Sequence, residues 1–109
     1  MRGRVLKECE VWVARDRQAI VGFIALREGW IDHLYLRPGH YRQGIGSALM
    51  NLAKSRQPQG LRLYAFQKNE RARAFYEAHR FTAIEFGDGS FNEEKEPDVL
   101  YRWPGNSLA

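Results

Sequence analysis

Apolar and polar residues alternate along residues 8–16, which is the pattern of a strand with one buried face. Residues 19–29 are apolar on both faces, as expected for a central strand. Polar turns at 15–18 and 28–29 close these two segments, so we predict an antiparallel hairpin. Residues 30–36 form a third predicted strand, which ends before Pro38.

The second half of the chain mixes helical and strand periods. From residue 43, apolar side chains recur at helical spacing until Pro58 and Gly60. Residues 61–66 then predict a strand and 69–80 a second helix. Two closing strands are predicted at 81–86 and 99–103, separated by a glycine-containing, acidic loop.

The order strand, helix, strand in the middle of the chain implies a right-handed crossover. We therefore expect an α/β (α+β) fold, with one parallel β-α-β crossover inside a mixed and mostly antiparallel sheet. A chain of 109 residues is near the common size of one domain, so residues 1–109 are expected to form a single domain.

Composition narrows the class of protein. An apolar fraction of 44% favours a packed globule, and no apolar run approaches the ~18 residues of a membrane span. The single cysteine, Cys9, excludes an internal disulfide and is consistent with a reducing compartment. The net charge of +4 favours anionic partners, which include nucleic acid and phosphorylated cofactors.

A glycine-containing turn separates the third strand from the first helix, in the stretch HLYLRPGHYRQGIGSALM at 33–50. The N-terminus of a helix attracts phosphate, because its N–H groups are unpaired and its dipole is positive there. Gly44 and Gly46 have no Cβ to keep a ligand from those donors, and Arg42 adds charge. The pattern matches neither common phosphate-loop motif, since Leu49 stands where one of them requires glycine. A turn glycine followed by a helix-packing glycine is the alternative interpretation.

Asn69 and Tyr76 are seven residues apart, so two helical turns place them on one face of the second helix. Both helices follow strands of the predicted parallel pair. Because α/β sheets bind ligands at the carboxyl ends of such strands, we expect Gly44 and Asn69 to meet at a crevice.

These two segments together resemble the GNAT (Gcn5-related N-acetyltransferase) superfamily. LYLRPGHYRQGIGSALM is similar to its acetyl-CoA-binding motif, a strand and a proline followed by [RQ]-x-x-G-x-[GA] at the start of a helix. NERARAFYEAHRF is similar to its N-x-x-A-x-x-F-Y-E-x-x-G-F helix. The two motifs cover about residues 30–81, in the order and spacing of the family.

The resemblance implies roles for individual residues. The strand backbone at Leu34, Tyr35 and Leu36 would pair with the pantetheine arm of acetyl-CoA and orient the acetyl carbonyl, although both leucines can equally be core residues. The pyrophosphate would be held by Arg42, Gln43, Gly44, Ile45, Gly46 and Ser47.

On the second helix, the resemblance implies that Asn69 contacts the cosubstrate near its thiol. Tyr76 would be the general acid that protonates the departing CoA thiolate. As alternatives, Asn69 is only the N-cap of the helix and Tyr76 a half-buried aromatic residue.

The acceptor amine must lose a proton before it attacks, so a general base is expected. Asp32 and His33 lie on the strand that leads to the acetyl site, one on each face, and either of them or a bound water is a candidate. Tyr64 stands on the next strand where some relatives carry a base carboxylate, and a phenol is a poor base.

The sequence departs from the family pattern at three places. Tyr41 stands where the family usually has Arg or Gln, and Arg80 stands where it usually has Gly at the end of a helix. The family usually has a strand and two helices before the hairpin, and these helices wall the acceptor site; we expect them to be missing here. An open acceptor site, a partner subunit or an incomplete domain would each account for that difference.

We therefore expect an acetyl-CoA-dependent N-acetyltransferase that acts by direct attack of a primary amine, without a metal. The acceptor is not specified. The acidic loop at 92–98 either attracts a cationic acceptor or is a solvated charge run. A non-catalytic acyl-CoA-binding or regulatory module is the alternative function. Nucleic acid binding is disfavoured because the aromatic residues alternate into the core. We also expect a cytoplasmic protein, without membrane association, and a homodimer if a partner supplies the missing wall.

Overall fold

The computed structural model describes residues 2–6, 9–39, 44–90 and 92–106, with side chains from residue 10 onward. The chain divides into two compact units, Met1–Pro58 and Gln59–Ala109.

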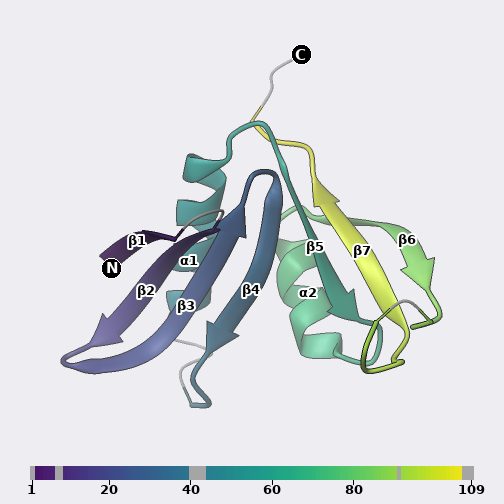
Figure 1. Ribbon diagram of the computed structural model, residues 1–109, viewed down its shortest axis with the longest axis horizontal. Coiled ribbons are helices and arrows are strands. Elements are labelled where there is room, and N and C mark those ends of the chain that lie inside the picture. The colour runs from purple at the N-terminus through teal and green to yellow at the C-terminus, as the bar shows by residue number, and fades with distance from the viewer. Residues whose placement is uncertain (1, 7–8, 40–43, 91, 107–109) are drawn as a thin grey trace. The chain divides into compact units, whose positions relative to one another are not determined.

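In the described part of the first unit, four antiparallel strands follow the order β1-β2-β3-β4, and one helix accompanies them (Figure 1). The elements are β1 (Arg2–Leu6), β2 (Cys9–Asp16), β3 (Ala19–Arg27), β4 (Trp30–Leu36) and α1 (Ile45–Arg56). The predicted hairpin and third strand are confirmed as β2, β3 and β4. The expectation that no strand precedes the hairpin is wrong, because β1 pairs with β2 from Arg2 opposite Val13 to Leu6 opposite Cys9.

The core of the first unit forms between β3 and α1. Strand β3 is buried on both faces, at Val21 and at residues 24–26, as its continuous apolar pattern predicts. Helix α1 contributes Leu49, Met50 and Ala53, all fully buried. A Cβ at Gly22 would lie 2.9 Å from the Tyr35 carbonyl oxygen, so a bare residue there allows close packing.

The described residues of the second unit, 59–90 and 92–106, form three strands and one helix. Its elements are β5 (Leu61–Phe66), α2 (Glu70–Ala78), β6 (Thr82–Gly87) and β7 (Asp98–Trp103). Strand β7 lies between β5 and β6 and is antiparallel to both. Helix α2 packs on one face of this sheet (Figure 1).

Alternation along the strands separates the two faces of that sheet. Leu61 and Leu63 are buried, and Leu63 pairs with the fully buried Tyr101. Tyr64 points to the other face and is 60% exposed. The face of Tyr101 is therefore the core side, and the face of Tyr64 is open.

The predicted order strand, helix, strand is present as β4, α1 and β5. Helix α1 begins at Ile45 rather than at residue 43, and α2 ends at Ala78 rather than at residue 80. No helix in the described part of the chain is long and apolar enough to cross a membrane.

Candidate functional site

Strand β4 carries a bulge at Asp32. His33 pairs with Ala25 and Ile31 pairs with Leu26, so Asp32 is an extra residue with no partner on β3. A bulge shifts the alternation of side chains by one position. Ile31 is consequently buried, whereas two places further along His33 is exposed.

The carboxylate of Asp32 already has a partner. Its Oδ2 accepts a hydrogen bond from Arg27 Nε at 2.6 Å, and the two groups form an ion pair. A general base would use a carboxylate oxygen of this kind, and the guanidinium already occupies Oδ2 with a charge-assisted hydrogen bond. His33 lies in solvent-accessible space on the same strand.

The side chains in the second half of β4 differ in exposure. Leu34 and Leu36 are half-buried, and Tyr35 is 43% exposed. The ring of Tyr35 stacks on Phe23 across the strand pair, with centroids 5.6 Å apart. The half-buried side chains of both leucines are consistent with core packing. The pairing of their backbone with the pantetheine arm stays a prediction.

Gly44 is the N-cap of α1 and has the left-handed φ of 75°. No side chain caps this end of the helix, and its first turn carries no acidic residue. A Cβ built on Gly44 would meet nothing within 4 Å, so the approach to the first N–H groups is open there. Such an end suits a phosphate, and the binding of a pyrophosphate by this turn stays a prediction.

The other predicted pyrophosphate residues differ in their surroundings. Gly46 is buried among the core residues of α1, which supports the packing interpretation of this glycine. Ile45 and Ser47 are half-buried in the same turn. Arg42 and Gln43 lie outside the described residues.

Asn69 is the N-cap of α2. Its Oδ1 accepts a hydrogen bond from the Ala72 backbone N–H at 3.2 Å. The alternative structural role of Asn69 is therefore confirmed. The cap does not use the Nδ2 donor, so a contact with a cosubstrate stays a prediction.

Tyr76 lies in an aromatic cluster near the end of α2. Its ring centroid is 5.9 Å from that of Tyr101, 6.1 Å from Phe81 and 5.7 Å from Phe75. Burial raises the pKa of the Tyr76 phenol above its ordinary value near 10. The phenol is thus fully protonated at neutral pH, as a general acid must be.

A tight turn ends α2 directly behind Tyr76. The Phe81 N–H donates to the Tyr76 carbonyl at 3.0 Å, and the Arg80 N–H donates to the Glu77 carbonyl at 3.1 Å. This is the Schellman arrangement, in which the residue directly after the helix C-cap is left-handed and usually glycine. Arg80 holds that position with φ 72°, so its departure from the family pattern is a strained backbone position.

The hydroxyl of Tyr101 joins α2 to β7. It donates to Glu77 Oε2 at 2.6 Å and accepts from Arg73 Nε at 3.0 Å. Arg73 Nη1 also donates to the Gln67 carbonyl at 3.3 Å. This cluster was not predicted from the sequence, although the spacing of Arg73 and Glu77 by one helical turn was a usable signal.

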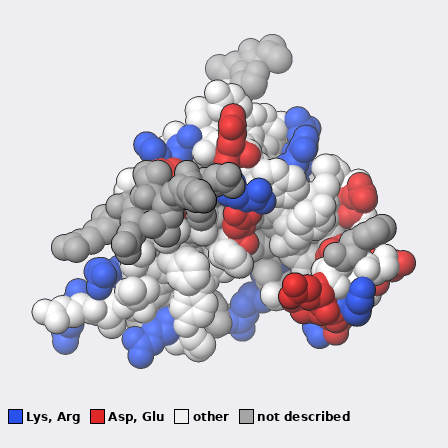
Figure 2. All heavy atoms as spheres, viewed as in Figure 1, with Lys and Arg blue, Asp and Glu red and all other residues white. Residues whose placement is uncertain are grey.

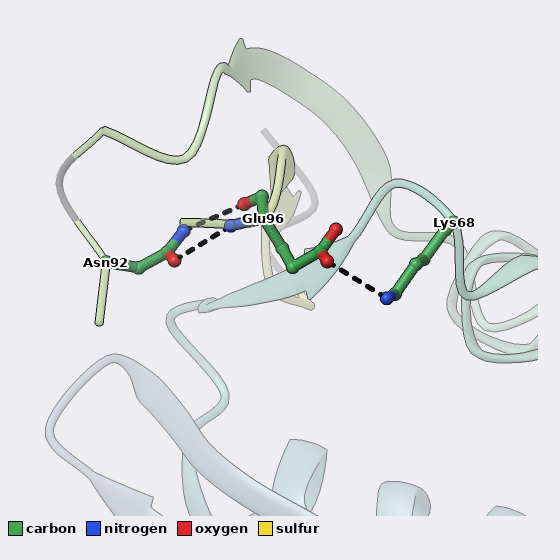
Figure 3. Close-up of polar contacts among 3 residues, drawn as sticks. All are labelled: Lys68, Asn92 and Glu96. Carbon is green, nitrogen blue, oxygen red and sulfur yellow. Dashed lines mark hydrogen bonds and ion pairs between the residues drawn. The ribbon is translucent and has the colours of Figure 1, made fainter. Parts of the chain in front are cut away.

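The loop between β6 and β7 is acidic and internally bonded. Figure 2 shows Asp and Glu side chains gathered at the lower right, where Figure 1 places this loop. Asn92 bonds to the backbone of Glu96 through both ends of its amide, and Lys68 Nζ pairs with Glu96 Oε1 at 3.1 Å (Figure 3). Glu96 is therefore neutralised by its own unit rather than fully solvated.

A pocket of about 440 Å³ opens beside this loop, within the second unit. It is lined by Tyr64, Ala65, Phe66, Glu85, Gly87, Asn92, Glu94, Asp98 and Leu100. Among residues 10–39, 44–90 and 92–106, no group of His, Cys, Asp and Glu is suited to hold a metal ion.

The predicted residues are thus divided between the two units. Asp32, His33, the β4 backbone and the Gly44 turn belong to the first unit, whereas Asn69 and Tyr76 belong to the second. The predicted meeting of Gly44 and Asn69 at one crevice stays a prediction.

Comparison with known proteins gives the family. The family model for the acetyltransferase (GNAT) domain matches residues 7–83. The chain is 31% identical over 106 residues to the peptidyl-lysine N-acetyltransferase YiaC of Escherichia coli strain K12, covering 95% of this chain and 70% of that protein. The chain belongs to the GNAT acetyltransferase family, and the resemblance drawn from its two motifs is confirmed.

Solved structures confirm the mixed α/β fold. Nourseothricin acetyltransferase superposes with a TM-score of 0.79 at 20% identity, over 90% of this chain and 66% of that chain. A Bacillus anthracis str. Ames protein, assigned as a streptothricin acetyltransferase and solved with acetyl coenzyme A, gives a TM-score of 0.77 at 20% identity. That match covers 91% of this chain and 64% of the Bacillus protein.

Proposed function

We propose that this protein transfers the acetyl group of acetyl-CoA to a primary amine by direct attack, and that lysine side chains of peptides are its acceptors. The observation that carries the proposal is the relationship to a peptidyl-lysine N-acetyltransferase along 95% of the chain. The sequence left the acceptor unspecified, and this relative supports the choice of lysine.

The residues of the first unit suit a CoA thioester. The open, left-handed Gly44 cap leaves the first turn of α1 accessible to a pyrophosphate, with Ile45, Gly46 and Ser47 supplying backbone donors. Arg42 and Gln43 would add polar contacts. The backbone of Leu34, Tyr35 and Leu36 would align the pantetheine arm, and Asn69 would contact the cosubstrate through its Nδ2.

Acetyl-CoA supplies an activated acyl group in its thioester, and the chain supplies proton transfer and position. Tyr76 would give its phenolic proton to the sulfur as the carbon–sulfur bond breaks. Positioned acid catalysis of this kind typically accelerates a reaction ~10²–10⁴-fold. The protonated state of Tyr76 at neutral pH, which burial secures, supports this role.

For the base, we propose that His33 or a water molecule removes the proton from the amine. The ion pair with Arg27 makes Asp32 the weaker candidate, because a base must first release that contact. The His33 side chain is exposed, and an imidazole is a common general base in enzymes.

The proposal includes the assembly of residues 1–109 as one catalytic domain that needs no metal. A cytoplasmic location without membrane association and a homodimer are parts of the same proposal. Analytical ultracentrifugation of the full chain tests the dimer, since a strictly monomeric and active protein contradicts it.

The function is tested by an acceptor screen that reads the free thiol of CoA released from acetyl-CoA. The panel contains a lysine peptide, a peptide with a free N-terminus but no lysine, a polyamine and an aminoglycoside. We expect release above the acceptor-free rate with the lysine peptide, and mass spectrometry should place one acetyl group on its lysine. Acetyl-CoA binding without any release would instead indicate the non-catalytic acyl-CoA-binding module.

A further inference from the structure

The pocket of the second unit lies on the face of its sheet that α2 does not cover. Tyr64 pairs with Leu100, and Leu100 pairs with Glu85, so these three side chains form one row across β5, β7 and β6. The next row contains Phe66, Asp98 and Gly87. The side chains of both rows point to the face of the sheet opposite Tyr101, because successive side chains along a strand alternate between faces. Tyr101 itself faces α2.

The walls of the pocket combine apolar surface with negative charge. Tyr64, Phe66 and Leu100 provide aromatic and aliphatic surface, and Tyr64 is 60% exposed. The charged residues among the described lining are Glu85, Glu94 and Asp98, and all are carboxylates. This is the reverse of the whole chain, whose net charge is +4.

Nearby cations are directed elsewhere. Lys68 pairs with Glu96, and Lys95 Nζ donates to the Ser90 carbonyl at 3.0 Å. Arg62 on β5 lies opposite Arg102 on β7, in the next row along the same face. Neither arginine lines the pocket. The carboxylates of Glu85 and Glu94 are therefore available to a cationic ligand.

Hydrogen bonds around the pocket hold the Asp98 carboxylate and its strand in place. Asn92 Nδ2 donates to Asp98 Oδ2 at 3.3 Å, and Gln67 Nε2 donates to the backbone carbonyls of Gly87 and Asp98. A Cβ on Gly87 would collide with Asp98 Oδ1, so the bare residue leaves room for the carboxylate. The loop and the strand ends thus form one bonded structure.

A ligand for this pocket needs an apolar stem and a positively charged end. A volume of about 440 Å³ is within the range of small-ligand sites, which are mostly apolar with a few polar groups. An alkylammonium ion meets both demands, because its methylene chain packs on aromatic faces and its three N–H donors bond to carboxylates.

We propose that this pocket binds an alkylammonium group of the acceptor, a lysine side chain, and that Glu85 and Glu94 determine this specificity. The inference rests on the proposed function for the identity of the acceptor. It adds the binding site and the charges that select the substrate.

The test uses Nα-acetyl-lysine methylamide as the probe and its norleucine analogue, which has a similar stem without the ammonium group. Binding to the full chain is followed by ¹H–¹⁵N NMR titration. We expect the lysine probe to shift amide signals of Tyr64, Glu85 and Leu100, and the norleucine analogue to bind at least ~10-fold more weakly. That factor corresponds to one hydrogen bond to a charged group.

The matched variants remove charge from the same loop and strand. Glu85→Gln with Glu94→Gln should weaken the lysine probe at least ~10-fold. Glu93→Gln removes an exposed carboxylate of the same loop that does not line the pocket, and should change affinity less than about twofold, as expected for distant screened charge. Both Glu85 and Glu94 are exposed, so the fold should survive.

The inference is overturned if Glu93→Gln weakens binding as much as the double variant, if the probe shifts signals away from the pocket, or if the probe does not bind. A parallel melt with acetyl-CoA separates the two proposals. Acetyl-CoA stabilisation and amine acetylation with no effect of the double variant reject the pocket alone. Specific binding of the probe without any acetyl transfer rejects the catalytic function.

Discussion

The ring of Tyr76 lies 5.9 Å from the ring of Tyr101, and the hydroxyl of Tyr101 bonds to Glu77, the residue next to Tyr76 on α2. The position of Tyr76, the proposed general acid, is therefore stabilised by the buried phenol of Tyr101 on β7. Arg73 bonds to the same hydroxyl from one turn earlier on α2. The orientation of Tyr76 depends on how firmly α2 is attached to β7.

Removing the Tyr101 hydroxyl should weaken that attachment. Tyr101→Phe leaves Glu77 and Arg73 without their shared partner in a part-buried place, so we expect unfolding free energy to fall by about 1–3 kcal/mol. Tyr35→Phe is the control, because Tyr35 is 43% exposed and its ring can still stack on Phe23. Equal losses for the two variants in urea unfolding would contradict a structural role for the Tyr101 hydroxyl.

Arg80 offers a stabilising substitution at the end of α2. Its φ of 72° strains an L-residue by roughly 1–2 kcal/mol, and glycine relieves that strain at some cost in chain entropy. We expect Arg80→Gly to raise the unfolding free energy by about 0.5–1 kcal/mol. Thermal unfolding and urea unfolding should both show this gain for Arg80→Gly. A loss of stability in this variant would mean that the Arg80 side chain makes a compensating contact.

A matched pair of alanine variants distinguishes a binding role of Gly44 from the role of an ordinary turn glycine. Gly44→Ala and Gly29→Ala both place a Cβ at positive φ, 75° and 79°, with no protein atom within 4 Å. Each should cost about 1 kcal/mol of stability. Only Gly44→Ala should weaken acetyl-CoA binding, by at least ~10-fold in calorimetry, which corresponds to about 1.4 kcal/mol. Equal acetyl-CoA affinities for the two variants would remove Gly44 from the binding site.

Alkaline pH should destabilise the protein through two phenols. Burial raises the pKa of Tyr76 and of Tyr101, and for Tyr101 the hydrogen bond to Glu77 raises it further while Arg73 opposes the shift. In the unfolded chain both phenols ionise near pH 10, whereas in the native state they still hold their protons. Their stabilising contribution is thus complete below about pH 10 and is lost as pH rises through the raised pKa values.

The measurement compares unfolding free energies at about pH 8 and about pH 11. Tyr101→Phe should reduce the loss between these two conditions, because it removes one of the two phenols with a raised pKa. An equal loss in the wild type and in Tyr101→Phe would assign the alkaline sensitivity to other groups.

Most elements were predictable because their signals are local. The strand at 61–66 alternates cleanly and follows Gly60, and its observed bounds match the prediction. Strand β1 was not predicted because RGRVL has few apolar residues, and its structure depends on pairing with β2. The bulge at Asp32 likewise depends on register with β3, which the sequence of one strand does not specify.

The site shows the same division. The roles suggested for Gly44, Asn69 and Tyr76 followed from two contiguous motifs. The departure of Arg80 from the family's glycine was visible in the sequence, but its left-handed conformation was not predicted. The acidic pocket combines β5, β6, β7 and the loop between the last two, so no contiguous motif marks it. Glu85 and Glu94 become neighbours of Tyr64 only when the strands pair.

The kinetic effect of Tyr76→Phe tests the central claim most directly. The substitution keeps the ring in its aromatic cluster, so fold and acetyl-CoA binding should be retained. With the lysine peptide as acceptor, kcat should fall at least ~10-fold, while the KM for acetyl-CoA stays within about twofold. A Tyr76→Phe variant that keeps the wild-type kcat would contradict Tyr76 as the acid, and a wild-type protein that binds acetyl-CoA without acetylating any amine would contradict the enzyme itself.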